Sequence, residues 1–277
     1  CKDLNFIDVI VYEDEALEIL DENSENTILF TEYMNVKSKN QSITSDKIAV
    51  IYAIGAINSG EGSYNTIGSE TTVKAIRKAA KDENVKAIVL RVNSPGGSAL
   101  ASDVILRELE LAKQKKKIVV SMGDYAASGG YYIACNADKI FANHSTITGS
   151  IGVFGVIPSN KKLLNEKLGL YIDTVNTHKY SDGFQGYRSL TDYEKAVIQE
   201  SVEQVYETFI TYVSEGRNMT KEEVNSIGQG RVWSGTDALS IGLVDEIGGL
   251  EDAIVSAADL ADLEDYRVIT LPKKEDP

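Results

Sequence analysis

Apolar and polar residues alternate in two distinct ways after residue 46. Short runs rich in β-branched residues have the length and character of buried strands, and they lie at 48–54, 87–92, 118–121 and 139–142. Between them, apolar residues recur with helical spacing at 70–82 and 99–113. Because strands that alternate with helices usually form a parallel sheet, the pattern predicts an α/β fold with a mostly parallel sheet.

The second half of the chain is predicted to be mainly helical. Helices are expected at 160–168, 191–216, 221–227, 233–242 and 253–260. One further strand is expected at 171–175, followed by a polar loop at 178–188 that is rich in Gly, Ser, Tyr and Asp. In segment 148–155, small residues are spaced along an apolar stretch, so we expect this segment to lie close to other backbone or to a ligand.

Residues 1–45 differ from the rest of the chain. They begin with apolar residues mixed with acids and end in sequence rich in Asn, Ser and Lys. We interpret them as a helix-bearing N-terminal arm or linker, and residues 46–277 as one domain whose tail at 273–277 frays. Because the chain lacks an initiator Met, we expect a processed or truncated chain, and any anchor or leading domain would have been removed with that Met.

Composition and charge exclude several classes of protein. The formal net charge of −14 opposes nucleic-acid binding, because phosphate backbones favour clustered Lys and Arg. Cys1 and Cys135 are the only cysteines, and we expect Cys135 to be buried on the helix that follows Ser128. Two cysteines do not indicate a disulfide framework. His144 and His178 belong to no cluster with metal-ligand spacing, so no metal is expected, and no cofactor is expected either. No apolar run reaches the roughly 18 residues of a membrane span, so the fragment is expected to be soluble.

Candidate chemistry lies in two glycine-rich turns that follow the second and third predicted strands. One turn is Pro-Gly-Gly at 95–97 and the other is Ser-Gly-Gly at 128–130. We expect both at the carboxyl ends of parallel strands, where α/β sheets bind ligands. Small residues around Ser128, at a predicted helix start, would let a substrate approach its hydroxyl, and the amides of Gly97 and Gly129 could face one carbonyl oxygen. The alternative is that both turns only connect neighbouring elements.

Four motifs occur in order along the chain. They are Val-Asn-Ser-Pro-Gly-Gly at 92–97, Ala-Ala-Ser-Gly-Gly-Tyr at 126–131, Thr-Gly-Ser-Ile-Gly at 148–152 and Gly-Arg-Val-Trp-Ser-Gly at 230–235. With these motifs the chain resembles the bacterial signal peptide peptidase A family, also called protease IV, from about residue 47 to about residue 258. The resemblance implies a Clp protease/crotonase-like fold of repeated ββα-type units, with a nucleophile at a helix start.

Residue by residue, the resemblance implies a serine endopeptidase with a Ser/Lys dyad. Ser128 corresponds to the nucleophile, Gly97 and Gly129 to the oxyanion donors, and Ser150 to a hydroxyl that helps to orient the base. Lys179 is the candidate base, since single-domain relatives carry their lysine in the corresponding loop. A lysine with an ordinary pKa of about 10.4 must be largely neutral to accept the serine proton, which requires a pKa roughly three units lower. Burial beside the substrate would lower it.

The resemblance leaves the source of the lysine open. Longer members of the family have two tandem halves, with the serine in the second half and the lysine in the first, and segment 147–157 here is more similar to the second half. If the chain is an isolated second half, its base is missing. Two other classes remain as alternatives: a crotonase-type acyl-thioester enzyme, against which Ser128 argues and which coenzyme A binding would reveal, and a non-catalytic peptide-binding protein.

The resemblance also implies partners and a location. The expected substrates are signal-peptide remnants and other hydrophobic peptides, with small apolar side chains preferred at the cut. We expect a homo-oligomer. The expected location is the bacterial cell envelope, with the catalytic domain outside the cytoplasm and associated with the membrane through a segment absent from this chain.

Overall fold

The computed structural model describes residues 9, 11, 12, 15, 19, 44–63 and 65–272. Its contacts divide the chain into two units, residues 1–42 and 43–277, and all the elements described below belong to the second unit. The predicted N-terminal arm at 1–45 lies almost entirely outside the described residues, and so does the predicted frayed tail at 273–277. Both therefore stay predictions.

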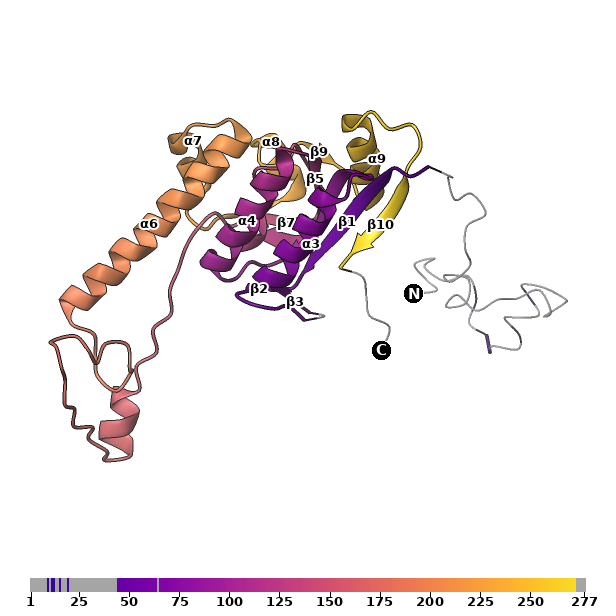
Figure 1. Cartoon of the computed structure of the whole chain (residues 1–277). Coiled ribbons are helices and arrows are strands. Elements are labelled where there is room, and N and C mark those ends of the chain that lie inside the picture. Colours follow the sequence, from indigo (N-terminus) through magenta and orange to yellow (C-terminus); the bar gives the residue numbers. More distant parts are fainter. Residues whose placement is uncertain are drawn as a thin grey trace. The chain divides into compact units, whose positions relative to one another are not determined.

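A mostly parallel sheet forms the centre of the second unit (Figure 1). Its main path runs in the order β10 (Arg267–Leu271), β1 (Lys47–Ile54), β4 (Val85–Ser94), β5 (Lys117–Ala127), β6 (Lys139–Ala142) and β9 (Glu246–Ile247). All neighbours on this path are parallel. β7 (Ile147–Gly149) pairs in parallel with the end of β5, and β8 (Val232–Ser234) pairs antiparallel with β7. β2 (Ala56–Asn58) and β3 (Thr66–Gly68) form a separate parallel pair.

Helices cover both faces of this sheet. α3 (Ser69–Lys81) and α4 (Ala99–Lys113) pack on one face, and α9 (Leu250–Leu260) packs on the other. Successive residues of β1 point to opposite faces, so that Ala49 and Ile51 join the first core while Ile48 and Val50 join the second. Because both faces are buried, the strands appear in the sequence as continuous apolar runs instead of alternating ones.

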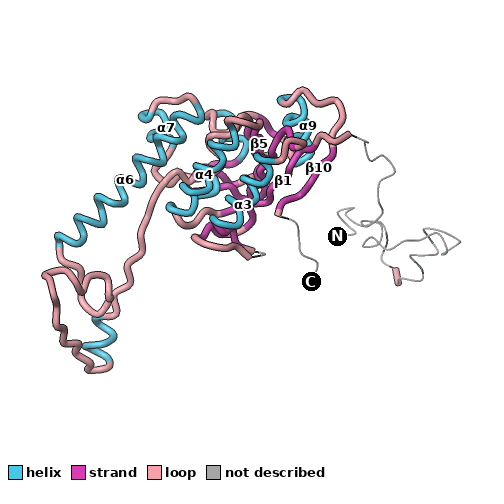
Figure 2. Tube along the Cα trace, viewed as in Figure 1, coloured by secondary structure: helices cyan, strands magenta, loops and turns pink. Residues whose placement is uncertain are grey.

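Between β7 and α6 (Asp192–Arg217), the chain extends away from the sheet, as Figures 1 and 2 show. We call residues 153–190 the excursion; its one regular element is the short π-helix η3 (Leu163–Lys167). α6 begins with a capping box between Thr191 and Glu194. The buried apolar residues of α6, Phe209, Ile210 and Val213, lie in its C-terminal half, which alone anchors the helix to the core. α7 (Lys221–Ile227) and α8 (Gly235–Ser240) follow.

The predicted α/β architecture is confirmed, with two differences that bear on function. The predicted strand at 171–175 is wrong: these residues are exposed and form no regular structure, because a strand needs a neighbour to pair with and the excursion offers none. The helix predicted to start at Ser128 is short, because β5 continues to Ala127 and α5 (Gly129–Tyr132) has only four residues. In the described part of the chain, no helix is long and apolar enough to cross a membrane.

Candidate active site

Ser128 lies at the carboxyl end of β5, where the chain turns sharply into α5. Its backbone has φ 53° and ψ −120°, a conformation that residues with a side chain rarely adopt. The turn is held from both sides, because the Ser128 amide donates to the carbonyl of Gly149 at 2.9 Å and the Ser128 carbonyl accepts from the Tyr132 amide at 2.9 Å. A strained strand-to-helix turn of this kind can present a serine hydroxyl above a sheet. The Ser128 side chain is half-buried, and no described residue hydrogen-bonds to its hydroxyl.

The second glycine-rich turn lies directly against Ser128. Because β4 and β5 are parallel neighbours, the turn at 95–97 leaves the same edge of the sheet. Gly96 has φ 101°, and a Cβ atom added there would lie 2.7 Å from the amide nitrogen of Gly129 and 2.8 Å from the Ser128 Cβ. A Cβ atom added to Gly129 would lie 3.3 Å from the amide nitrogen of Gly97. The structure therefore brings the two turns into contact, and glycine is needed because no side chain fits between them.

The amides of Gly97 and Gly129 are the chemically distinctive groups of these turns. Neither amide finds a hydrogen-bond acceptor among the residues that the structure describes. Unpaired N–H groups beside a serine hydroxyl can stabilise a negatively charged oxygen that forms next to them. The arrangement is thus suited to acyl transfer, with the serine as the attacking group.

Ser150 lies close to the same turn. It follows Gly149, whose pairing with Ala127 brings β7 to the end of β5. Ser150 has φ 48°, and its amide donates to the carbonyl of Arg231 at 2.7 Å. Its side chain is half-buried, and none of the described residues hydrogen-bonds to its hydroxyl. A second serine hydroxyl is therefore available near Ser128.

Lys179 is the one predicted site residue that the structure does not bring to Ser128. It lies in the exposed part of the excursion, which extends away from the sheet (Figure 1). Its ammonium is 5.1 Å from the ring centroid of Tyr180, and Tyr180 stacks on Tyr193 at 4.7 Å between centroids. The single chain thus holds Ser128, Gly97, Gly129 and Ser150 together and leaves Lys179 elsewhere.

A cluster of charged side chains holds the loop that carries Lys179. Arg188 donates to both carboxylate oxygens of Asp182 at 2.9 Å and to those of Glu194 at 2.7 and 2.9 Å. These hydrogen bonds hold the pKa of Asp182 well below its usual range. Hydrogen bonds from Arg188 and Thr191 lower the pKa of Glu194 to about 2. The cluster ties the 178–188 loop to the start of α6.

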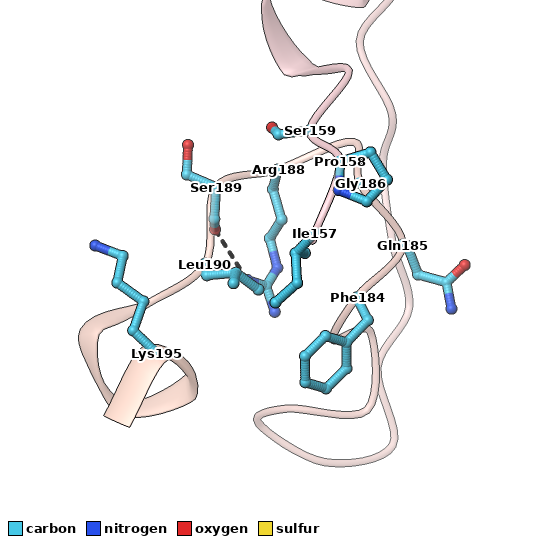
Figure 3. A pocket seen from close by; sticks show the side chains of 10 residues that line it. All are labelled: Ile157, Pro158, Ser159, Phe184, Gln185, Gly186, Arg188, Ser189, Leu190 and Lys195. Atoms are coloured by element: carbon cyan, nitrogen blue, oxygen red, sulfur yellow. Dashed lines mark hydrogen bonds between the residues drawn. The ribbon is translucent and has the colours of Figure 1, made fainter. Parts of the chain in front are cut away.

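Residues of the excursion, together with Lys195 of α6, line a cavity of about 210 Å³. Figure 3 shows Ile157, Phe184 and Leu190 around it, together with Arg188, which donates to the Ser189 carbonyl at 3.1 Å. Ser128 and the glycine amides are not among the residues that line this cavity. The hollow is therefore separate from the candidate active site, and its one arginine is already paired with two carboxylates.

One supporting element of the site was not predicted from the sequence. β2 brackets the turn at 95–97, because the Ile57 amide donates to the Gly96 carbonyl at 2.9 Å and the Ile57 carbonyl accepts from the Ser98 amide at 2.8 Å. A strand of three residues is too short to produce a periodic apolar pattern. The available signal in the sequence was the glycine at position 55, directly after the first predicted strand. In the structure Gly55 has φ 96° and bends the chain just before β2.

Cys135 is fully buried, as predicted, but it lies beyond the end of α5 and not on a shared helix with Ser128. Its thiol contacts the Tyr132 carbonyl at 3.2 Å, and burial raises its pKa to about 12. The thiol is therefore protonated and unreactive near neutral pH. Among the described residues, no group of three or more His, Cys, Asp or Glu side chains could hold a metal ion.

Known proteins resemble this chain in sequence. Residues 110–264 match the model of peptidase family S49. The chain is 44% identical over 246 residues to Protease 4 of Salmonella typhi, a match that covers 88% of this chain and 40% of the relative. It is 35% identical over 290 residues to the chloroplastic serine protease SPPA of Arabidopsis thaliana, covering 100% of this chain and 43% of the relative. The chain thus spans less than half the length of these relatives.

The fold also has a solved counterpart. A mutant of ClpP1 from Listeria monocytogenes superposes with a TM-score of 0.51 and 18% sequence identity, covering 74% of this chain and 94% of that one. At this identity the likeness shows the fold alone, and the predicted Clp protease-like fold is confirmed. The family match and the relatives go further, because they cover the Ser128 turn. The chain therefore belongs to peptidase family S49, a family of serine peptidases.

Proposed function

We propose that this chain supplies the nucleophile of a serine endopeptidase that degrades cleaved signal peptides and other apolar peptides. The observation that carries the proposal is the Ser128 turn. It presents a half-buried hydroxyl, without a partner among the described residues, beside the unpaired amides of Gly97 and Gly129. Membership of a serine peptidase family supports this chemistry.

In the proposed reaction, the Ser128 Oγ attacks the scissile carbonyl carbon while a neutral lysine takes the hydroxyl proton. The carbonyl oxygen becomes negatively charged and accepts hydrogen bonds from the amides of Gly97 and Gly129. Each such donor typically stabilises the transition state by about 3 kcal/mol. The lysine then gives its proton to the leaving amine, the C–N bond breaks, and an acyl ester remains on Ser128. Water, deprotonated by the same lysine, hydrolyses the ester.

The proposed base is Lys179, with Ser150 helping to orient it. In the single chain the Lys179 ammonium lies over the Tyr180 ring. To reach Ser128, either the excursion of the same chain moves towards the Ser128 turn, or the excursion of a neighbouring copy supplies the lysine. The second candidate is a lysine from another domain of a longer protein. Protease 4 of Salmonella typhi, of which the chain spans 40%, is long enough to contain a further domain of this kind.

Exposed apolar side chains of the excursion support the proposed partners. Large exposed side chains occur at Phe154, Val156, Leu168, Leu170, Tyr171, Val175 and Phe184. Apolar surface of this extent usually marks a contact with another molecule. We therefore propose a homo-oligomer and apolar peptide substrates. From the family resemblance we also place the protein in the bacterial cell envelope, outside the cytoplasm and held at the membrane by a segment beyond this chain.

A crotonase-type activity on acyl-thioesters is the alternative that shares this fold and the paired amides. Such enzymes typically act through carboxylates and do not require a serine at a strained turn. The family match and the Ser128 hydroxyl favour the peptidase. Binding of coenzyme A, measured by calorimetry, would favour the alternative.

The test of the proposed function is hydrolysis of an unstructured, fluorogenic apolar peptide. We expect the wild-type chain to cleave the peptide and the Ser128→Ala variant to lose this cleavage. Measurable cleavage at the same rate by both proteins would remove Ser128 from the mechanism. If Lys179 is the base, Lys179→Ala and the permanently charged Lys179→Arg each lose several powers of ten in rate while they still fold. If the lysine comes from another domain, the isolated chain is nearly inert, and adding that domain restores cleavage even in Lys179→Ala.

A further inference from the structure

Two fully buried serines, Ser94 and Ser102, lie beneath the candidate active site. Neither belongs to the predicted dyad, and both contact the turns that carry the paired amides. We propose that Ser94 and Ser102 are positioning residues that hold the Gly97 and Gly129 amides side by side for the oxyanion. The inference rests on the proposed function, since it concerns how this chain builds the site that stabilises the oxyanion.

Ser94 fixes the direction of the Gly97 amide. It is the last residue of β4, and its Oγ accepts a hydrogen bond from the Gly96 amide at 3.1 Å, which folds the chain back after the strand. The Gly96 carbonyl then accepts from the Ile57 amide at 2.9 Å. Because a trans peptide is planar, its carbonyl and its N–H point in opposite directions. With the Gly96 carbonyl turned towards β2, the N–H of Gly97 must point away from β2.

Ser102 fixes the position of Gly129 against this turn. It lies on the first turn of α4, and its Oγ donates to the Ser98 carbonyl at 2.9 Å. A Cβ atom added to Gly129 would lie only 2.6 Å from the Ser102 Oγ, so the Gly129 Cα rests directly on this hydroxyl. The Ser98 amide is held at the same time by the Ile57 carbonyl at 2.8 Å. Ser102 therefore joins the start of α4, the turn at 95–97 and the start of α5.

A role confined to folding is the competing explanation, because buried hydroxyls are normally hydrogen-bonded. The two explanations predict different effects on the affinity for a tetrahedral ligand and on the affinity for an intact peptide. Misplaced amides weaken the tetrahedral state, in which a charged oxygen needs two donors, and leave the binding of an intact peptide unchanged. Ser121 is a matched control: it is a fully buried serine in β5 whose hydroxyl accepts from Arg91 at 2.8 Å, seven residues before Ser128 and outside the site.

The experiment measures the affinity of the 277-residue chain for an apolar peptide boronic acid and for the same peptide without boron. The Ser128 Oγ forms a bond to boron, its proton passes to solvent, and the tetrahedral boronate places an oxygen at the oxyanion position. No lysine base and no leaving group are required. Loss of one oxyanion donor typically costs a factor of about 10² to 10³ in rate. For a donor that is displaced but not removed, we expect Ser94→Ala to weaken boronate binding about 10- to 100-fold.

For Ser102→Ala we expect a smaller loss, and for Ser121→Ala none, while all variants bind the parent peptide as the wild type does. Wild-type affinity of Ser94→Ala for the boronate would overturn the inference, and so would an equal loss in Ser121→Ala. If Ser94→Ala does not fold, Ser94→Cys, which keeps only a weak acceptor, takes its place in the same comparison. Failure of the proposed function has a different signature, because wild type and Ser128→Ala would then bind the boronate equally.

Discussion

Gly96→Ala is the substitution that tests the contact between the two turns most severely. Gly96 has φ 101°, and a methyl group there would meet three atoms of the Ser128 turn within 3 Å. Those atoms are the Gly129 nitrogen at 2.7 Å, the Ser128 Cβ at 2.8 Å and the Ala127 carbonyl oxygen at 2.9 Å. Two of the three are backbone atoms, so the turns must separate to admit the methyl group.

The size of the effect follows from two contributions. A side chain at a sparsely populated positive φ costs about 1–3 kcal/mol, and overpacking of a buried contact costs about 1–3 kcal/mol more. We therefore expect Gly96→Ala to lower the free energy of unfolding by about 2–6 kcal/mol. Because separation of the turns displaces at least one amide donor, kcat should fall by a factor of about 10² to 10³.

Gly242→Ala is the matched control for the backbone contribution. Gly242 has φ 79°, and a methyl group there would meet no atom within 4 Å. This variant should therefore lose only about 1–3 kcal/mol and keep its kcat. Urea unfolding gives the stabilities, and hydrolysis of a fluorogenic apolar peptide, with the lysine-bearing domain added where the chain needs it, gives kcat. A Gly96→Ala variant with wild-type kcat would refute the idea that these turns build the oxyanion site.

Two further predictions follow from pKa values. Because burial raises the pKa of Cys135 to about 12, iodoacetamide at pH 8 should leave this thiol unmodified in the folded chain and alkylate it in urea. Mass spectrometry measures both alkylation rates, and equal rates in the folded chain and in urea would contradict the burial of Cys135. Because Arg188 holds the pKa of Glu194 at about 2, the ion pair stabilises the folded chain above pH about 4 and is lost as the pH falls towards 2. Arg188→Ala should raise the Glu194 pKa in carboxyl NMR titrations, and an unchanged titration would contradict the pairing.

The parts of the fold that the sequence predicts are those with strong local patterns. The strands β1, β4 and β6 and the helix α4 appear where continuous apolar runs and helical spacing place them. The two glycine-rich turns follow from the order of strands, since neighbouring parallel strands end at the same edge of a sheet.

The parts that the sequence does not predict depend on distant contacts. Segment 171–175 has a strand-like composition but no partner strand. β2 is identified only from the structure, by its hydrogen bonds to Gly96 and Ser98. The strain at Ser128, with φ 53°, arises because Gly149 holds its amide from another strand. The position of Lys179 could not be predicted for the same reason, because it depends on how the excursion packs and not on a local pattern.

The site at which a serine-reactive fluorophosphonate attaches shows most directly whether Ser128 is the nucleophile. The attacking serine oxygen forms a bond to phosphorus, fluoride leaves, and the hydroxyl proton passes to the base. Because Ser128 combines a free hydroxyl with the neighbouring amides, we predict a single adduct on Ser128 and none in Ser128→Ala, with the lysine-bearing domain added where the chain needs it. Mass spectrometry of the proteolysed protein locates the adduct. An adduct on another serine, together with unchanged peptide cleavage by Ser128→Ala, would show that Ser128 is not the nucleophile.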